Sequence, residues 1–423
     1  MRDSSKPGAT AGMVAPGRRG QLLRAEPFRL FFPLAFLLGI VGVAHWVLFT
    51  TGLISHYLRR FHGVTQTQSF LLAFAAGFLC TAIPKRTRTA PATWLELGAL
   101  LVLLPVVSLA TLFEYDGIGQ AAYAAALLTL AQFAVRRFFD VGPGHPIALG
   151  SAGPRRPPAS FAMVPVGLLA GLLGAAVSIV GRGAASNWAL MLGERLTFEG
   201  VFICLALGVG AFFLPLAGRG EAAPDVGPGR GWHAVAYAAA AGGVIVSLFA
   251  EAGGWPRAGA GLRGAIALAV LVASGTWRPP TRPGTNRRLL WMAMWAIPVG
   301  LFGAASFPGV RVEALHVMFV GGFGVLAFSV ATHVTFGHTG QEARQGARAW
   351  PVAAFGLLFA VAMMFRISAV ADPNSYFRSL GIAASVWLLG TIVWAAYVLP
   401  AILRAPAPPT TTASPSAHVS SSP

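Results

Sequence analysis

The stretch LFFPLAFLLGIVGVAHWVLFTTGL, residues 30–53, decides the fold of this chain. It holds no Asp, Glu, Lys or Arg, and about 20 apolar residues in a helix cross about 30 Å of hydrocarbon. Further apolar runs follow at about 68–83, 94–113, 118–135, 161–180, 198–216, 232–250, 262–274, 289–306, 312–336, 352–371 and 380–402. The sequence therefore predicts an all-α polytopic integral membrane protein of about twelve transmembrane helices, in which the start of the eighth span is the least defined.

The composition supports a lipid bilayer as the partner of this chain. Hydrophobic residues make up 55% of the sequence and charged residues only 11%, against about 25% charged in soluble domains. The net charge is +17, but Lys and Arg lie between the apolar runs rather than in one stripe, so nucleic acid is not predicted as a partner. The two cysteines, Cys80 and Cys204, stand apart inside apolar runs, which indicates neither a disulfide framework nor a zinc site.

The basic residues also predict an orientation, because cytoplasmic loops carry an excess of Lys and Arg. With the N-terminus inside, 22 of the 31 basic residues fall in inner segments and 9 in outer ones. Both termini are therefore expected in the cytoplasm. The predicted organisation is a disordered N-terminal segment at 1–27, a transmembrane domain at 28–404 and a disordered tail at 405–423.

Histidines are the main candidates for chemistry, because ionisable groups in or beside membrane spans are rare and costly. Imidazole is also the commonest metal ligand and a haem ligand. The candidates lie in the first span, the outer loop after it, and the tenth span and its end: His45, His56, His62, His316, His333 and His338.

On the tenth span, His316 and His333 are expected on one helix face, roughly 25 Å apart along the axis. They therefore serve two separate sites, or one site and a proton path, or they are polar helix ends that hydrogen-bond to neighbouring helices. Arg366, near the outer end of the eleventh span, could pair with a carboxylate or a haem propionate, or it could extend to the membrane interface.

The second and tenth spans share a short internal sequence similarity. His62, Leu72, Ala73, Phe74 and Thr81 match, at a constant offset, His316, Leu326, Ala327, Phe328 and Thr335. Such residues are common in membrane helices, so these matches leave a duplication open.

Several segments resemble the NnrS family. They are Pro27-Phe28-Arg29-Leu30-Phe31-Phe32, the run Gly77 to Pro84 (GFLCTAIP), and the block from Ala314-Leu315-His316-Val317 to Gly337-His338-Thr339-Gly340. The resemblance implies a bacterial inner-membrane protein of twelve spans that is associated with haem and copper and with nitric oxide tolerance in denitrification. It matches His316 and His338 to family histidines, and His62 to the first histidine of the family's W-H-x-H-E motif.

The chain departs from that motif. Val64 stands where the family has its second histidine, and Thr65 stands where it has its glutamate. In addition, His333 replaces an arginine that usually precedes the G-H-T-G segment. With two members of the motif missing, the chain binds one cofactor fewer, uses His333 or His56 as a substitute ligand, or binds no cofactor.

The leading hypothesis is a haem- or copper-binding membrane protein that acts in nitric oxide tolerance. Its cofactor ligands are His62 and His316, with Arg366 as a partner for the cofactor and His333 and His338 as further metal candidates. Haem ligation by His62 and His316 requires the second and tenth spans to lie close together. A secondary transporter or channel for a small solute, and a metal-free assembly or regulatory protein, are the alternatives.

Overall fold

The structure is a computed structural model that describes residues 16–139, 156–221 and 229–404. Within them, twelve helices are long and apolar enough to cross a membrane, which confirms the predicted all-α fold. Their bounds are Phe28–Thr50, Arg59–Thr87, Trp94–Leu112, Asp116–Phe139, Ala159–Gly183, Asn187–Arg219, Gly231–Ala252, Pro256–Ala273, Thr285–Ser306, Pro308–His338, Trp350–Ala371 and Pro373–Leu403.

Three of the spans contain a π-helical segment, and they are the second, sixth and tenth. Each consists of a short α-helix, a π segment and a longer α-helix. The elements are α3 (Arg59–Val64), η1 (Thr65–Leu71) and α4 (Leu72–Thr87); α8 (Asn187–Arg195), η3 (Leu196–Gly200) and α9 (Val201–Arg219); and α13 (Arg311–His316), η5 (Val317–Gly324) and α14 (Val325–His338). Long π segments are rare and occur mostly at functional sites.

The other nine spans surround these three. They are α2 (Phe28–Thr50), α5 (Trp94–Leu112), α6 (Asp116–Phe139), α7 (Met163–Gly183), α10 (Gly231–Ala252), α11 (Pro256–Ala273), α12 (Thr285–Ser306), α15 (Trp350–Ser368) and α16 (Tyr376–Leu403). Helix α6 packs on α7, α11 on α12, and α16 on α2, which closes the ring. These contacts join the fourth span to the fifth, the eighth to the ninth and the twelfth to the first. The bundle therefore divides into three groups of four spans, and the second, sixth and tenth spans are each the second span of their group.

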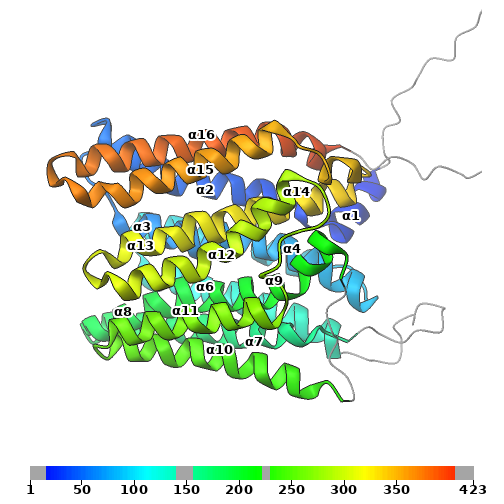
Figure 1. Cartoon of the computed structure of the whole chain (residues 1–423), viewed down its shortest axis with the longest axis horizontal. Coiled ribbons are helices and arrows are strands. Elements are labelled where there is room, and N and C mark those ends of the chain that lie inside the picture. The colour runs from blue at the N-terminus through cyan, green and yellow to red at the C-terminus, as the bar shows by residue number, and fades with distance from the viewer. Residues whose placement is uncertain (1–15, 140–155, 222–228, 405–423) are drawn as a thin grey trace, which may run out of the picture.

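The bundle has two distinct ends (Figure 1). Helices α3, α8 and α13 lie at one end, here called the α3 end. Helix α1 (Pro16–Ala25) lies at the other, here called the α1 end, together with the last described residues of α16. Helix α1 falls inside the segment that the sequence predicts to be disordered, whereas residues 1–15 and the tail at 405–423 lie outside the described residues.

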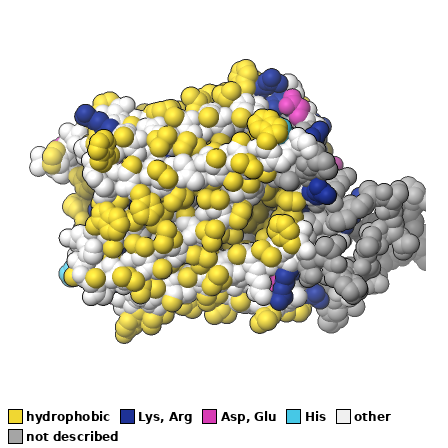
Figure 2. All heavy atoms as spheres, turned by 90° about the horizontal axis from the view of Figure 1, so that it is seen from below, with side chains coloured by type: hydrophobic (Ala, Val, Ile, Leu, Met, Phe, Trp, Pro, Cys, Tyr) yellow, Lys and Arg dark blue, Asp and Glu magenta, His cyan; other side chains and the backbone are white. Residues whose placement is uncertain are grey.

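The surface of the bundle matches a lipid environment. Figure 2 shows hydrophobic side chains over the middle of one face and Lys and Arg side chains toward its ends. Large apolar side chains such as Val102 and Leu357 are 62% and 66% exposed. Exposed apolar area on that scale is stable in a bilayer, where it meets lipid tails instead of water.

Several span boundaries differ from the sequence prediction, and the largest difference is at the sixth span, which begins at Asn187 rather than near residue 198. The second span begins at Arg59, so His62 lies in a helix and not in the expected outer loop. The eighth span begins at Pro256 rather than near residue 262, and it includes the fully buried Arg263. At the second span, Arg60 bonds to Asp116 on α6 and Gln66 bonds to Gly39 on α2, which allows the helix to extend further than apolar composition alone indicates.

Candidate functional site

His62 lies on α3, just ahead of η1. Its Nδ1 is 2.9 Å from the carbonyl oxygen of Gly42 on α2, and the indole of Trp46 meets the ring edge-on at 5.9 Å. A carbonyl oxygen only accepts a hydrogen bond, so Nδ1 carries the proton and Nε2 keeps its lone pair. This is the arrangement found in metal-ligating histidines, whose second nitrogen donates to a carbonyl or carboxylate.

His316 is the last residue of α13 and stands directly ahead of η5. Its Nδ1 is 2.6 Å from the carbonyl oxygen of Val312, one turn earlier in the same helix. The same reasoning places the proton on Nδ1 and leaves Nε2 with a free lone pair. The second and tenth spans therefore present the same imidazole tautomer.

The two imidazoles belong to one neighbourhood at the α3 end. Arg366 lies within electrostatic range of both rings, and His316 lies within that range of His62. Arg366 Nη1 is also 3.2 Å from Glu313 Oε1, in a pair whose side chains are only 14% and 11% exposed. His62, His316 and Arg366, three residues that the sequence proposed for one site, therefore lie at the same end of the bundle.

The donor set of this site suits one kind of group. Among the described residues there is no cluster of three or more His, Cys, Asp or Glu that could hold a metal ion by itself. A structural zinc site takes four protein ligands, so two imidazoles do not suffice for it. Haem would need fewer protein ligands, because the macrocycle supplies the remaining nitrogens, so histidine is a suitable ligand type for it.

The positions that depart from the family motif are buried beside this site. Val64 is 1% exposed and Thr65 is fully buried. The hydroxyl of Thr65 has no hydrogen-bond partner. Because an ideal Cβ on Gly42 would come within 2.9 Å of Thr65 Cγ2, η1 and α2 are in close contact here.

His333 and His338 lie at the α1 end, far along the tenth span from His316. The ring of His333 meets Phe213 edge-on at 5.1 Å, and its Nδ1 has no hydrogen-bond partner. The Nδ1 of His338 is 2.9 Å from Lys85 Nζ and 3.6 Å from Glu26 Oε1. These two histidines therefore belong to a different region from His62 and His316.

The remaining histidines of the α3 end have local structural roles. His45 Nε2 accepts a 2.6 Å hydrogen bond from the backbone N–H of Leu58, which holds the connection between α2 and α3. His56 is exposed, and its Nδ1 is 2.8 Å from the hydroxyl of Ser55. His45 also lies within electrostatic range of His62.

A buried ion network, absent from the sequence interpretation, joins the sixth, seventh, eighth and tenth spans. Glu251 on α10 pairs with Arg263 on α11 and with Arg311 on α13. Glu199, in η3, pairs with the same two arginines, at 3.3 Å from Arg263. Arg195 lies 3.4 Å from Glu251. The feature of the sequence that indicates this ion network is Glu199, a carboxylate inside an apolar run.

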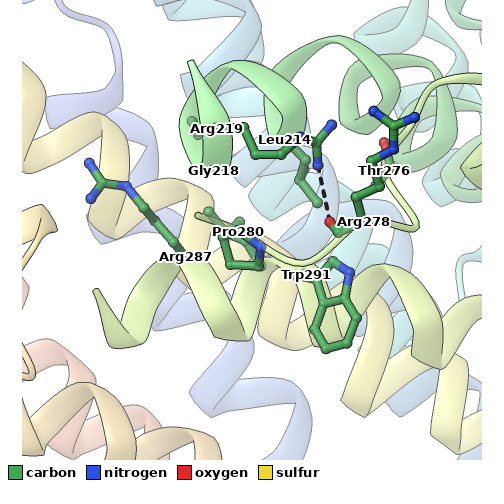
Figure 3. Close-up of a pocket in the computed structure, with 10 residues that line it drawn as sticks. Leu214, Gly218, Arg219, Thr276, Arg278, Pro280, Arg287 and Trp291 are labelled. Atoms are coloured by element: carbon green, nitrogen blue, oxygen red, sulfur yellow. Dashed lines mark hydrogen bonds between the residues drawn. The ribbon is translucent and has the colours of Figure 1, made fainter. Parts of the chain in front are cut away.

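A small basic pocket lies at the α1 end, between the end of α9 and the start of α12. Its volume is about 10 Å³, and Arg219, Arg278 and Arg287 contribute to its lining. Arg219 Nη1 donates to the carbonyl oxygen of Arg278 at 3.0 Å. In Figure 3 the guanidinium of Arg287 points away from the other two, so the charges do not converge on one ligand position.

The fold defines a twelve-span helical membrane protein in which the second and tenth spans each carry an imidazole ahead of a π segment. The protein-family model described as NnrS protein matches residues 22–405, and the chain belongs to the NnrS family. No curated protein matches the chain. Family membership confirms the resemblance that the sequence motifs indicate.

Proposed function

We propose that this protein is a bacterial inner-membrane member of its family that binds haem through His62 and His316 and acts in nitric oxide tolerance linked to denitrification. One observation carries the proposal: both imidazoles donate Nδ1–H to a backbone carbonyl and keep Nε2 free. Haem, when bound, supplies an iron centre for redox chemistry and for small diatomic ligands.

The protein residues around the site orient the ligands. The carbonyl oxygens of Gly42 and Val312 select the tautomer and fix the direction of each ring. Arg366 supplies a positive charge close to both rings, and a guanidinium is well suited to binding a carboxylate such as a haem propionate. Glu313 holds Arg366 in place at 3.2 Å.

The test is the visible spectrum and the metal content of the full chain purified in detergent. We expect a Soret band and iron in the wild type, and loss of the band in His62→Ala and in His316→Ala. His56→Ala is the matched control, because His56 is exposed and bonded only to Ser55 nearby, and it should keep the band. All variants are compared by gel filtration to confirm folding.

Copper is assayed in the same preparations. The pair His333 and His338 at the α1 end is proposed as the copper-responsive region, because His333 Nδ1 has no partner in the structure. A double replacement of these residues by Ala should lower copper content without removing the Soret band. A colourless wild-type protein without iron or copper would contradict the proposal and favour the metal-free assembly or regulatory role.

A further inference from the structure

A cavity of about 100 Å³, partly open to the surface, lies between the three inner spans and α2. The second span contributes residues from Leu71 to Leu79, the sixth from Phe202 to Leu214, and the tenth from Phe323 to Val330. In each span these residues recur every three or four positions, so each helix presents one stripe to the same space. The π segments lie between this cavity and the α3 end that carries the two imidazoles.

The lining of the cavity is apolar throughout. No lining residue has a charged side chain or a side chain that forms conventional hydrogen bonds. Six phenylalanines dominate it: Phe32, Phe74, Phe78, Phe202, Phe213 and Phe323. A buried water molecule needs two to four polar partners, so apolar cavities of this kind stay dry.

Aromatic contacts between spans hold the cavity open. Phe78 of the second span meets Phe213 of the sixth edge-on at 5.8 Å, and Phe202 of the sixth span meets Phe323 of the tenth at 6.1 Å. Each contact joins rings on different helices, so closing the space would require two spans to move together. Protein interiors are close-packed, and a void that persists in them leaves its lining without contacts that a bound apolar molecule would restore.

We infer that this cavity binds a small, uncharged, apolar molecule of a few heavy atoms. An engineered apolar cavity of about 150 Å³ takes up benzene or xenon, so a volume of about 100 Å³ suits xenon or a diatomic gas. Binding here needs no metal, because no lining side chain is a metal ligand, so the inference goes beyond the proposed haem site.

The test is crystallography of the full chain under xenon pressure. We expect one anomalous xenon peak between Phe74, Phe202 and Phe323 in the wild type. Ala206→Leu and Ala327→Leu each add three carbon atoms to the lining and should reduce xenon occupancy to background. Ala353→Leu is the matched control, because Ala353 is exposed on α15, and it should leave the peak unchanged.

A further variant tests the cavity without filling it, in case the Leu variants misfold. Val330→Ala enlarges the cavity and should retain or increase the xenon peak. The inference is overturned if the wild-type cavity contains no xenon, if it contains ordered water or an acyl chain instead, or if Ala206→Leu leaves the peak intact.

The visible spectrum separates this result from the proposed function. If xenon binds in a colourless protein, only the haem proposal fails. If a Soret band is present without xenon in the cavity, only the present inference fails.

Discussion

His62 on α3 donates its Nδ1–H to the carbonyl oxygen of Gly42 on α2, at 2.9 Å. This bond crosses between the first and second spans, and it depends on the close approach that a glycine permits. An ideal Cβ on Gly42 would lie 2.5 Å from Gln66 Nε2 and 2.9 Å from Thr65 Cγ2. The orientation of the imidazole is therefore coupled to the spacing between α2 and η1.

The first prediction concerns that spacing. Gly42→Ala should push η1 away from α2 and weaken the His62 hydrogen bond while leaving both imidazoles in the chain. Loss of such a supporting bond typically lowers the affinity of a metal site about 10–100-fold. Haem affinity, titrated by absorption, should fall by this order. Gly98→Ala is the control, because a Cβ on Gly98 meets nothing within 4 Å. Unchanged affinity in Gly42→Ala would show that the bond does not position His62.

The second prediction concerns the buried ion network. Arg263→Gln leaves Glu251 and Glu199 short of a counter-charge in a fully buried position. Removal of one partner from a buried pair costs about 3–5 kcal/mol. Chemical unfolding in detergent should show this loss, whereas Arg257→Gln, at an exposed position of the same helix, should change stability little. A double Glu251→Gln, Arg263→Gln variant should lose less than the sum of the single variants.

The third prediction concerns pH at the α1 end. Burial opposes ionisation of Glu26, but hydrogen bonds and charges from His338 and Arg29 outweigh it and lower the pKa of its carboxyl below the ordinary value of 4.5. A carboxyl with a lowered pKa stabilises the folded state above its unfolded pKa, and this contribution is lost as pH falls through the folded pKa.

The pH test compares thermal unfolding of the wild type and Glu26→Gln. Hydrogen bonds to charged groups contribute about 1.5–3 kcal/mol, so the variant should be less stable by this amount at pH 7. The difference should shrink below about pH 4.5. Glu342→Gln, at an exposed position, serves as the control. A difference that is constant from pH 7 to pH 3.5 would contradict the assigned pKa direction.

The fourth prediction is the orientation in the membrane. The excess of Lys and Arg in alternate loops predicts that the α1 end faces the cytoplasm. A fluorescent protein fused to the C-terminus should fluoresce, and alkaline phosphatase fused there should be inactive. Phosphatase inserted between α2 and α3 should be active. The opposite pattern would reverse the orientation.

Most of the fold can be predicted from the apolar runs. The second span shows why the length of an apolar run underestimates the length of the helix. The sequence Thr65-Gln66-Thr67 is too polar to predict as membrane helix, so the expected span begins at Gln68. In the structure Gln66 donates to the carbonyl oxygen of Gly39 on α2, and Gln68 accepts a hydrogen bond from Gln120 on α6. Partners from other spans satisfy these groups, and no local pattern reveals such partners.

Some features of the candidate site could likewise be predicted from the sequence, and others could not. The rarity of histidines in an apolar chain singled out His62 and His316, and family similarity supported both. Their proximity could not be derived, since a separation of more than 250 residues carries no information on distance. The pair of Arg366 with Glu313 and the network around Glu251 likewise depend on contacts between spans.

The sequence by itself determined that this protein crosses a membrane twelve times, because the cost of placing polar backbone in hydrocarbon makes each long apolar run a helix. It also determined which few ionisable groups could carry chemistry. Only the tertiary structure decided that the second, sixth and tenth spans lie inside the ring, that two imidazoles with free Nε2 atoms share one end, and that an apolar cavity lies beyond them. Those features arise from packing between distant helices, where shape and partner groups decide the arrangement and local composition does not.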